Sequence, residues 1–284
     1  MAYFLILIKS LTNISESVLI RKYTDKHTSG SMIFTGVISL FAMLFFLFTD
    51  SDGFHPDMEI IPYAIAFGAL YCLAYLLTFV ALACGPFTLS MLIISYCLVF
   101  PIIYGIVWLD EELTILMCIG FLLLAVSLYM VRGTKASDGH GISVKWIISI
   151  TVVCIGNGGL SIIQKMQQLR FDNAQNHEFM AVSLALSAVL LLLIGTIKDR
   201  KKIREVMRCG LPYAGAAGIS NGANNYLSLV INNLLPISIF SPISSGVKIV
   251  VSYICSGWLF SEHYNRRQIV GVAIGAVAVI CLSI

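Results

Sequence analysis

The sequence predicts an all-α integral membrane protein with ten transmembrane helices, arranged as two five-helix inverted repeats. Two observations predict the membrane: 58% of the 284 residues are hydrophobic, and only 12% are charged, about half the charged fraction of an average soluble domain. A third observation, a shift of about 150 positions that aligns the two halves, predicts the repeat. The net charge of +3 is too small to indicate a nucleic-acid partner.

Ten apolar runs are long enough to cross a bilayer, for which a helix needs roughly 20 residues. Because hydrocarbon offers the backbone no hydrogen-bond partner, each run is expected to be helical. The first run contains Lys9 and Glu16 and lacks a cleavage site, so we expect a retained span and not a signal peptide. The predicted spans are 3–22, 31–49, 60–83, 87–108, 113–131, 143–165, 178–197, 210–231, 236–259 and 267–284.

The repeat divides the chain into a first half (1–132), a connecting loop (133–142) and a second half (143–284). It aligns Pro62-Tyr63-Ala64 with Pro212-Tyr213-Ala214. Because five spans per half is an odd number, the second half must enter the membrane from the opposite side. Inverted repeats of this kind are typical of secondary transporters, whose substrate site lies between the halves near the midplane. A duplicated scaffold without a transport role is the alternative.

Loop charge predicts the orientation. Most lysines and arginines of the predicted loops, including the cluster at 198–208, lie on one face. The positive-inside rule places that face in the cytoplasm and both termini outside. The expected location is a bacterial plasma membrane.

Polar residues recur at helical spacing on six of the ten predicted spans, namely the first, third, fourth, sixth, eighth and ninth. Because a polar side chain in hydrocarbon is costly, these faces are expected to line one central cavity. For any single face, hydrogen bonding between helices is the alternative explanation. The candidate substrate-binding residues are Lys248, Asn13, Glu16, Tyr71, Tyr75, Tyr104, Asn157, Asn221, Asn225 and Ser245.

Two charges lie within predicted spans. Lys248 is close to the middle of its span and offers a point charge to a carboxylate or phosphate. Glu16 is a candidate for proton coupling, because burial shifts the pKa of a carboxyl group. A structural ion pair between the two is the alternative.

The remaining motifs point away from catalysis. The sequence contains no CxxC pair, P-loop or recognisable catalytic constellation, so we expect neither an enzyme nor a bound metal or cofactor. The acidic run 110–112 is expected to cap the span that follows it. Gly271 and Gly275 permit close helix approach, either within the chain or across a homodimer.

The segment Trp108-Leu109-Asp110-Glu111-Glu112-Leu113-Thr114, followed by Gly120, resembles the signature that closes each half of EamA-type transporters. Trp258-Leu259-Phe260-Ser261-Glu262, with Gly271, is a second copy that lacks the threonine. The chain therefore resembles ten-helix EamA-like members of the drug/metabolite transporter (DMT) superfamily.

That resemblance implies a central cavity between spans 1–4 and 6–9, alternating access and cytoplasmic termini, the last being the reverse of the charge-based orientation. In the small four-helix relatives an essential glutamate occupies the first span. The matching position here is closer to Asn13, and Glu16 lies one turn further on.

The sequence thus predicts a secondary transporter that moves a small polar metabolite by alternating access. We expect a zwitterionic or anionic substrate such as an amino acid. The alternative function is a non-transporting membrane scaffold or a lipid-handling subunit. Apart from the substrate and the lipid bilayer, the expected partner is a second copy of the chain.

Overall fold

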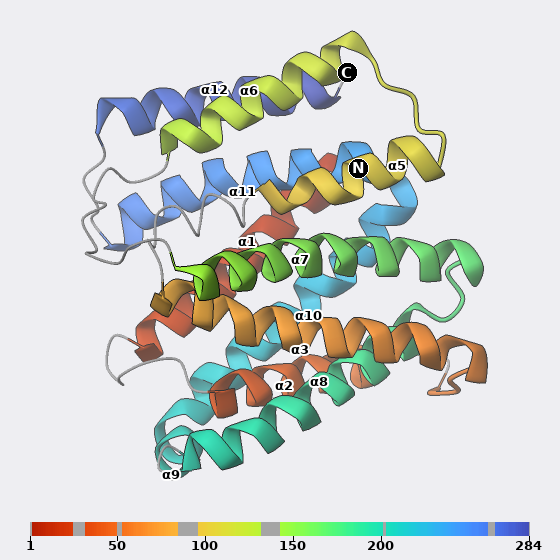
Figure 1. Ribbon diagram of the computed structural model, residues 1–284, viewed down its shortest axis with the longest axis vertical. Coiled ribbons are helices and arrows are strands. Elements are labelled where there is room, and N and C mark those ends of the chain that lie inside the picture. Colours follow the sequence, from red (N-terminus) through yellow and green to blue (C-terminus); the bar gives the residue numbers. More distant parts are fainter. Residues whose placement is uncertain are drawn as a thin grey trace. The chain divides into compact units, whose positions relative to one another are not determined.

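The computed structural model describes residues 2–24, 32–49, 53–84, 96–131, 143–200, 203–260 and 265–283, and these ranges are almost entirely helical, without a strand (Figure 1). The all-α part of the predicted fold class is therefore confirmed. The long helices are α1 (Ala2–Thr24), α2 (Met32–Thr49), α3 (Ile61–Cys84), α5 (Val99–Trp108), α6 (Ile115–Val131), α7 (Val144–Arg170), α8 (Asn176–Lys198), α10 (Leu211–Leu234), α11 (Ile237–Phe260) and α12 (Arg266–Ser283). Shorter segments are η1 (Met58–Ile60), η2 (Tyr96–Leu98), α9 (Ile203–Glu205) and the π-helical η4 (Val206–Gly210).

Helix boundaries follow the predicted spans to within about one turn. There are two differences: α7 continues past residue 165 to Arg170, and the first part of span 87–108 lies outside the described residues. Within the described residues, four helices are long and apolar enough to cross a membrane, namely α1 over Ala2–Ile20, α2, α7 and α8. Their length and composition indicate a membrane protein.

Two compact units make up the chain, and each combines segments from both halves of the sequence. Unit 1 comprises Met1–Ser10, Leu73–Ile162 and Leu234–Ile284, and unit 2 comprises Leu11–Cys72 and Ile163–Asn233. Unit 1 holds the pairs α5–α11 and α6–α12, and unit 2 holds the pair α2–α8 (Figure 1). Each pair joins one helix from 1–132 to one from 143–284. The predicted connecting loop, 133–142, lies outside the described residues, and the division of the chain at that point stays a prediction.

Within unit 2, small residues bring α2 and α8 close together. A Cβ atom on Gly195 would lie 2.9 Å from the Ile33 backbone nitrogen, and one on Gly36 would lie 2.9 Å from Leu192 Cγ. Such contacts leave no room for a side chain, so glycine at these positions allows the two helices to approach.

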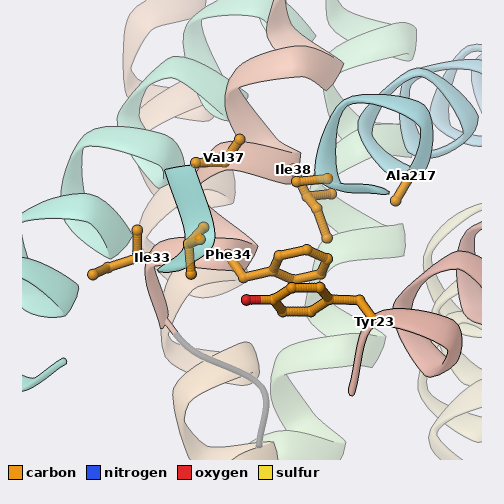
Figure 2. Packing of buried hydrophobic residues seen from close by; sticks show 8 residues of the cluster. Tyr23, Ile33, Phe34, Val37, Ile38 and Ala217 are labelled. Atoms are coloured by element: carbon orange, nitrogen blue, oxygen red, sulfur yellow. The ribbon is translucent and has the colours of Figure 1, made fainter. Parts of the chain in front are cut away.

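A buried apolar cluster in unit 2 holds the end of α1 against α2 and α10. The Tyr23 ring stacks on Phe34, with ring centroids 4.2 Å apart and an angle of 4° between the planes (Figure 2). The cluster consists of Tyr23, Ile33, Phe34, Val37, Ile38, Val206, Ala214 and Ala217. Offset stacking and close aliphatic contact of this kind fix the start of α10 in unit 2.

Within unit 1, α6 and α12 are joined through small residues. Ser127 Oγ donates a 2.7 Å hydrogen bond to the Gly271 carbonyl oxygen. A Cβ atom on Gly275 would lie 2.6 Å from the same Ser127 oxygen. The Gly271/Gly275 face therefore packs on α6 of its own chain, one of the two expected uses of that face. A homodimer stays a prediction.

The acidic turn after α5 caps a different helix from the expected one. Glu111 Oε1 and Oε2 accept hydrogen bonds from the backbone N–H groups of Ile237 (2.9 Å) and Ser238 (2.8 Å), which are the first residues of α11. The cap of α6 is instead Thr114, whose hydroxyl accepts from the Met117 N–H at 3.2 Å. The prediction that Glu111 caps its own following helix is therefore wrong. A carboxylate favours any helix N-terminus within reach, and in the fold the nearer one belongs to α11.

Candidate solute-binding site

In unit 2, α10 turns a glycine face toward α2. A Cβ atom on Gly218 would lie 2.5 Å from Phe41 Cβ and 2.6 Å from the Ile38 carbonyl oxygen, and one on Gly222 would lie 2.7 Å from Phe45 Cβ. Only glycine allows so close an approach to the α2 backbone. This contact fixes the rotation of α10 about its own axis, and therefore the direction of its polar face.

The polar face of α10 carries Asn221, Asn225, Ser228 and Asn232. Their spacing of four, three and four residues keeps all of them on one side of the helix, over a length of about 16 Å. Asn221, Ser228 and Asn232 are 5%, 9% and 2% exposed. A row of buried polar side chains along a helix of this length is unfavourable in hydrocarbon unless each finds a partner or a polar ligand.

At one end of this face α10 meets α1. Glu16, which is 5% exposed, accepts a 3.0 Å hydrogen bond from Asn221 Nδ2. Asn221 Oδ1 in turn accepts a 2.9 Å bond from Asn225 Nδ2. The buried carboxylate is thus held by a charge-assisted hydrogen bond, and the amides form a chain that leads away from it. Asn13 lies about one turn before Glu16 on α1, and its Oδ1 is buried without a hydrogen-bond partner among the described residues.

At the other end the face meets the last turns of α7. Lys165 Nζ donates to the Asn232 carbonyl oxygen at 2.6 Å, and Gln168 Nε2 donates to the Leu229 carbonyl oxygen at 2.8 Å. Asn232 is among the last four residues of α10, whose carbonyl groups have no partner within the helix. The polar face therefore runs from a carboxylate on α1 to an amide and an ammonium group on α7, within one unit.

Four predicted site residues, Asn13, Glu16, Asn221 and Asn225, lie along this α1–α10 contact. Tyr71 belongs to the same unit but to an aromatic cluster: its ring lies 6.2 Å from that of Phe67, which contacts Phe179 at 5.3 Å. The side chain of Tyr75 lies outside the described residues.

The other four predicted site residues belong to unit 1. Tyr104 stacks on Trp108 at 5.9 Å, and Ser245 donates to a carbonyl oxygen of its own helix at 3.0 Å. Asn157 lies beside the Cys97 thiol. Lys248 is exposed on α11.

Sequence reasoning missed two polar features. In unit 1, the Lys9 ammonium lies 3.4 Å from Ser244 Oγ and 5.6 Å from the centre of the Phe240 ring on α11, a contact that the sequence does not indicate. In unit 2, Lys165 is the last residue of its predicted span, but α7 continues to Arg170 and Lys165 therefore lies within the helix. The i, i+3, i+4 spacing of Gln164, Gln167 and Gln168 is the sequence signal that extends the polar face of α7 past that point.

The chemistry available along the described face is that of neutral amides, hydroxyls, the Glu16 carboxylate and the Lys165 ammonium group. Among the described residues, no group of three or more histidine, cysteine or acidic side chains could hold a metal ion. Amides both donate and accept hydrogen bonds, so the arrangement is suited to holding a polar solute by hydrogen bonds.

Comparisons with known proteins show the fold alone. No protein-family model matches the sequence, and no curated protein matches it. A crystal structure described only as that of a protein matches with a TM-score of 0.72 and 12% sequence identity, over 99% of this chain and 98% of that one. The class that fold and site define is accordingly a helical membrane protein with a buried polar face.

Proposed function

We propose that the chain is a secondary transporter that moves a small polar metabolite across the membrane by alternating access. The observation that carries the proposal is the buried polar face of α10, which extends from Glu16 to Gln168. Scaffold helices associate through apolar and small-residue packing and through hydrogen bonds of single polar side chains between helices. A row of asparagines is costly there and is explained by a solute or water that passes along it.

The pairing of helices supports an inverted repeat of ten spans. In each of the pairs α2–α8, α5–α11 and α6–α12, one helix comes from each half of the sequence. In addition, Pro62 and Pro212, which the repeat aligns, are both the second residue of their helices. Proline is favoured there, because that N–H has no partner within the helix. Membership of the EamA-like branch of the DMT superfamily fits the same arrangement and forms part of the proposal.

Glu16 is the group in this proposal that would couple transport to protons. It is buried and accepts a hydrogen bond from the Asn221 amide. We place the protein in a bacterial plasma membrane, with the basic loops in the cytoplasm and both termini outside. The proposed role is transport and not catalysis.

Counterflow uptake by the purified full chain in liposomes tests the proposal. The solute panel would contain amino acids, sugars, polyols, sugar phosphates and quaternary amines, each with and without a pH gradient. We expect saturable uptake of at least one solute, reduced about tenfold by Asn225→Ala, as expected for loss of one hydrogen bond to a buried group. Asn233→Ala, an exposed position on the same helix, is the matched control.

Two results would contradict the proposal. Absence of uptake for the whole panel, together with no solute-dependent rise in the unfolding temperature, would favour the scaffold or lipid-handling alternative. Uptake that Asn225→Ala and Lys248→Ala both leave unchanged would show that the solute passes elsewhere. Labelling of single cysteines in the 198–208 loop from outside intact cells would refute the orientation alone.

A further inference from the structure

The last two turns of α7, together with the end of α10, hold a group of buried amides whose hydrogen-bonding capacity is not used. We call it the amide cluster and define it as Gln164, Gln167, Gln168 and Asn232, all in unit 2. Their exposed fractions are 7%, 0%, 2% and 2%. These side chains are therefore as buried as the apolar core of the unit.

Several polar atoms of the cluster have no hydrogen-bond partner among the described residues. They are Gln164 Nε2, Gln167 Nε2, Gln167 Oε1, Gln168 Oε1 and Asn232 Oδ1. A buried amide without a partner is unfavourable, and buried polar side chains in native proteins nearly always have one. Four neighbouring amides with open positions therefore indicate that something else supplies the missing partners.

The hydrogen-bonding character of these atoms without partners indicates which class of ligand they would bind. Both donors and acceptors are open, and every open group is neutral. A buried ion needs a counter-charge, and the one ammonium on this face, that of Lys165, donates to the Asn232 carbonyl oxygen. A hydroxyl group donates one hydrogen bond and accepts others, so a solute with several hydroxyls matches a mixed, uncharged set of partners.

We propose that the amide cluster binds an uncharged polyhydroxylated solute, so that the transported metabolite is a sugar or polyol. The inference rests on the proposed transport function and narrows its substrate class. It differs from the zwitterionic or anionic substrate expected from Lys248 and Glu16 in the sequence. Along α10 the amide cluster lies apart from the Glu16–Asn221 contact. Solute binding at the cluster would therefore not involve the Glu16 carboxylate, to which we assign proton coupling.

The test is counterflow uptake by the full chain in liposomes, with D-glucose, D-xylose, D-mannitol and myo-inositol as uncharged probes. L-alanine, choline and a sugar phosphate are the charged probes. We expect saturable uptake of at least one uncharged probe, and a KM about tenfold higher in Gln167→Met, which keeps the side-chain length and removes both open atoms. Gln175→Met is the matched control, because Gln175 lies outside the cluster and accepts from the Asp57 N–H.

Gln164→Met provides a second variant should Gln167→Met fail to fold, since Gln164 Nε2 is another buried atom of the cluster without a partner among the described residues. Uptake of a charged probe alone would overturn this inference and leave the transport proposal standing. Uptake of a sugar or polyol with an unchanged KM in both variants would show that the cluster holds only water. Absence of uptake for every probe would instead contradict the transport function itself.

Discussion

Glu111, in the turn between α5 and α6, holds the first N–H group of α11 at Ile237 through a 2.9 Å hydrogen bond. The second carboxylate oxygen accepts from the next residue. A residue of the first sequence half thus caps a helix of the second. Gly105 makes this contact possible, because a Cβ atom there would collide with the Glu111 carboxylate.

Replacement of Glu111 by glutamine should therefore destabilise unit 1. The variant keeps the length of the side chain but loses the charge and one of the two acceptor oxygens. We expect a loss of about 1–2 kcal/mol, the usual range for a helix cap, measured as the unfolding of the purified chain in detergent. The neighbouring Glu112 is exposed, so Glu112→Gln should change the stability little. Equal effects of the two variants would contradict the cap.

The Glu111 contact also shows which features of the fold can be predicted from the sequence and which cannot. Apolar runs locate the helices, because hydrocarbon and the backbone allow few other structures, and the boundaries agree to within about one turn. The acidic turn was recognised as a cap, but the choice of helix depends on tertiary contacts between residues far apart in the chain. The sequence repeat alone does not predict these tertiary contacts.

The candidate site shows the same limit. The spacing of Asn221 and Asn225 predicts a shared polar face, and the structure adds the partner on α1, Glu16. The contacts of the Lys9 and Lys165 side chains could not be predicted from the sequence, because a lysine near the end of a span reaches either lipid headgroups or a neighbouring helix. Which of the two it reaches depends on packing.

Loss of the amide beside Glu16 should be costly. Asn221→Ala removes the donor of the 3.0 Å hydrogen bond to a carboxylate that is 5% exposed. We expect a destabilisation of about 1–3 kcal/mol, because the acceptor stays buried. Thermal unfolding in detergent measures it. Asn233→Ala, an exposed position near the end of the same helix, should stay within about 0.5 kcal/mol of the parent; if it is the more harmful change, the Glu16 contact does not hold the helices together.

Lys165 and Arg170 look alike in the sequence but should differ in effect. Lys165 donates to the Asn232 carbonyl oxygen at 2.6 Å. Arg170 forms a 3.5 Å ion pair with Glu59 in which the two side chains are 63% and 67% exposed. Lys165→Met should cost about 1–3 kcal/mol, whereas Arg170→Met should cost less than about 1 kcal/mol, since water and salt screen surface pairs. Chemical unfolding at two salt concentrations separates them, and a larger loss in Arg170→Met would refute this ranking.

Two glycines one turn apart on α10 should respond in opposite directions to alanine. At Gly218 the new Cβ would meet the Ile38 carbonyl oxygen at 2.6 Å, whereas at Gly215 the nearest atom, Phe41 Cζ, lies 3.4 Å away. Gly218→Ala should destabilise by about 1–3 kcal/mol through overpacking. Gly215→Ala should be neutral or stabilise by up to about 1 kcal/mol, because alanine favours the helix. Equal unfolding temperatures for the two variants would show that α10 does not approach α2 as closely as described.

Tyr23 should make the protein sensitive to alkaline pH. It lies beyond the apolar stretch Ala2–Ile20 of α1, and burial, followed by the nearby Glu205 and Cys209, raises the pKa of its hydroxyl above the ordinary value of 10.0. The folded state therefore holds the phenolic proton more tightly than the unfolded chain does. This contribution to stability is complete below about pH 10 and is lost as the pH rises through the folded-state pKa.

Tyr23→Phe removes that titration and keeps the ring that stacks on Phe34 (Figure 2). The unfolding temperature of the parent, measured in detergent from pH 8 upward, should fall more steeply above about pH 10 than that of the variant. Below that pH the difference between the two proteins should be constant, because the tyrosine is then protonated in both the folded and the unfolded chain. Parallel curves across the whole range would mean that the Tyr23 hydroxyl titrates alike in both states, and that its burial against Phe34 does not favour the protonated form.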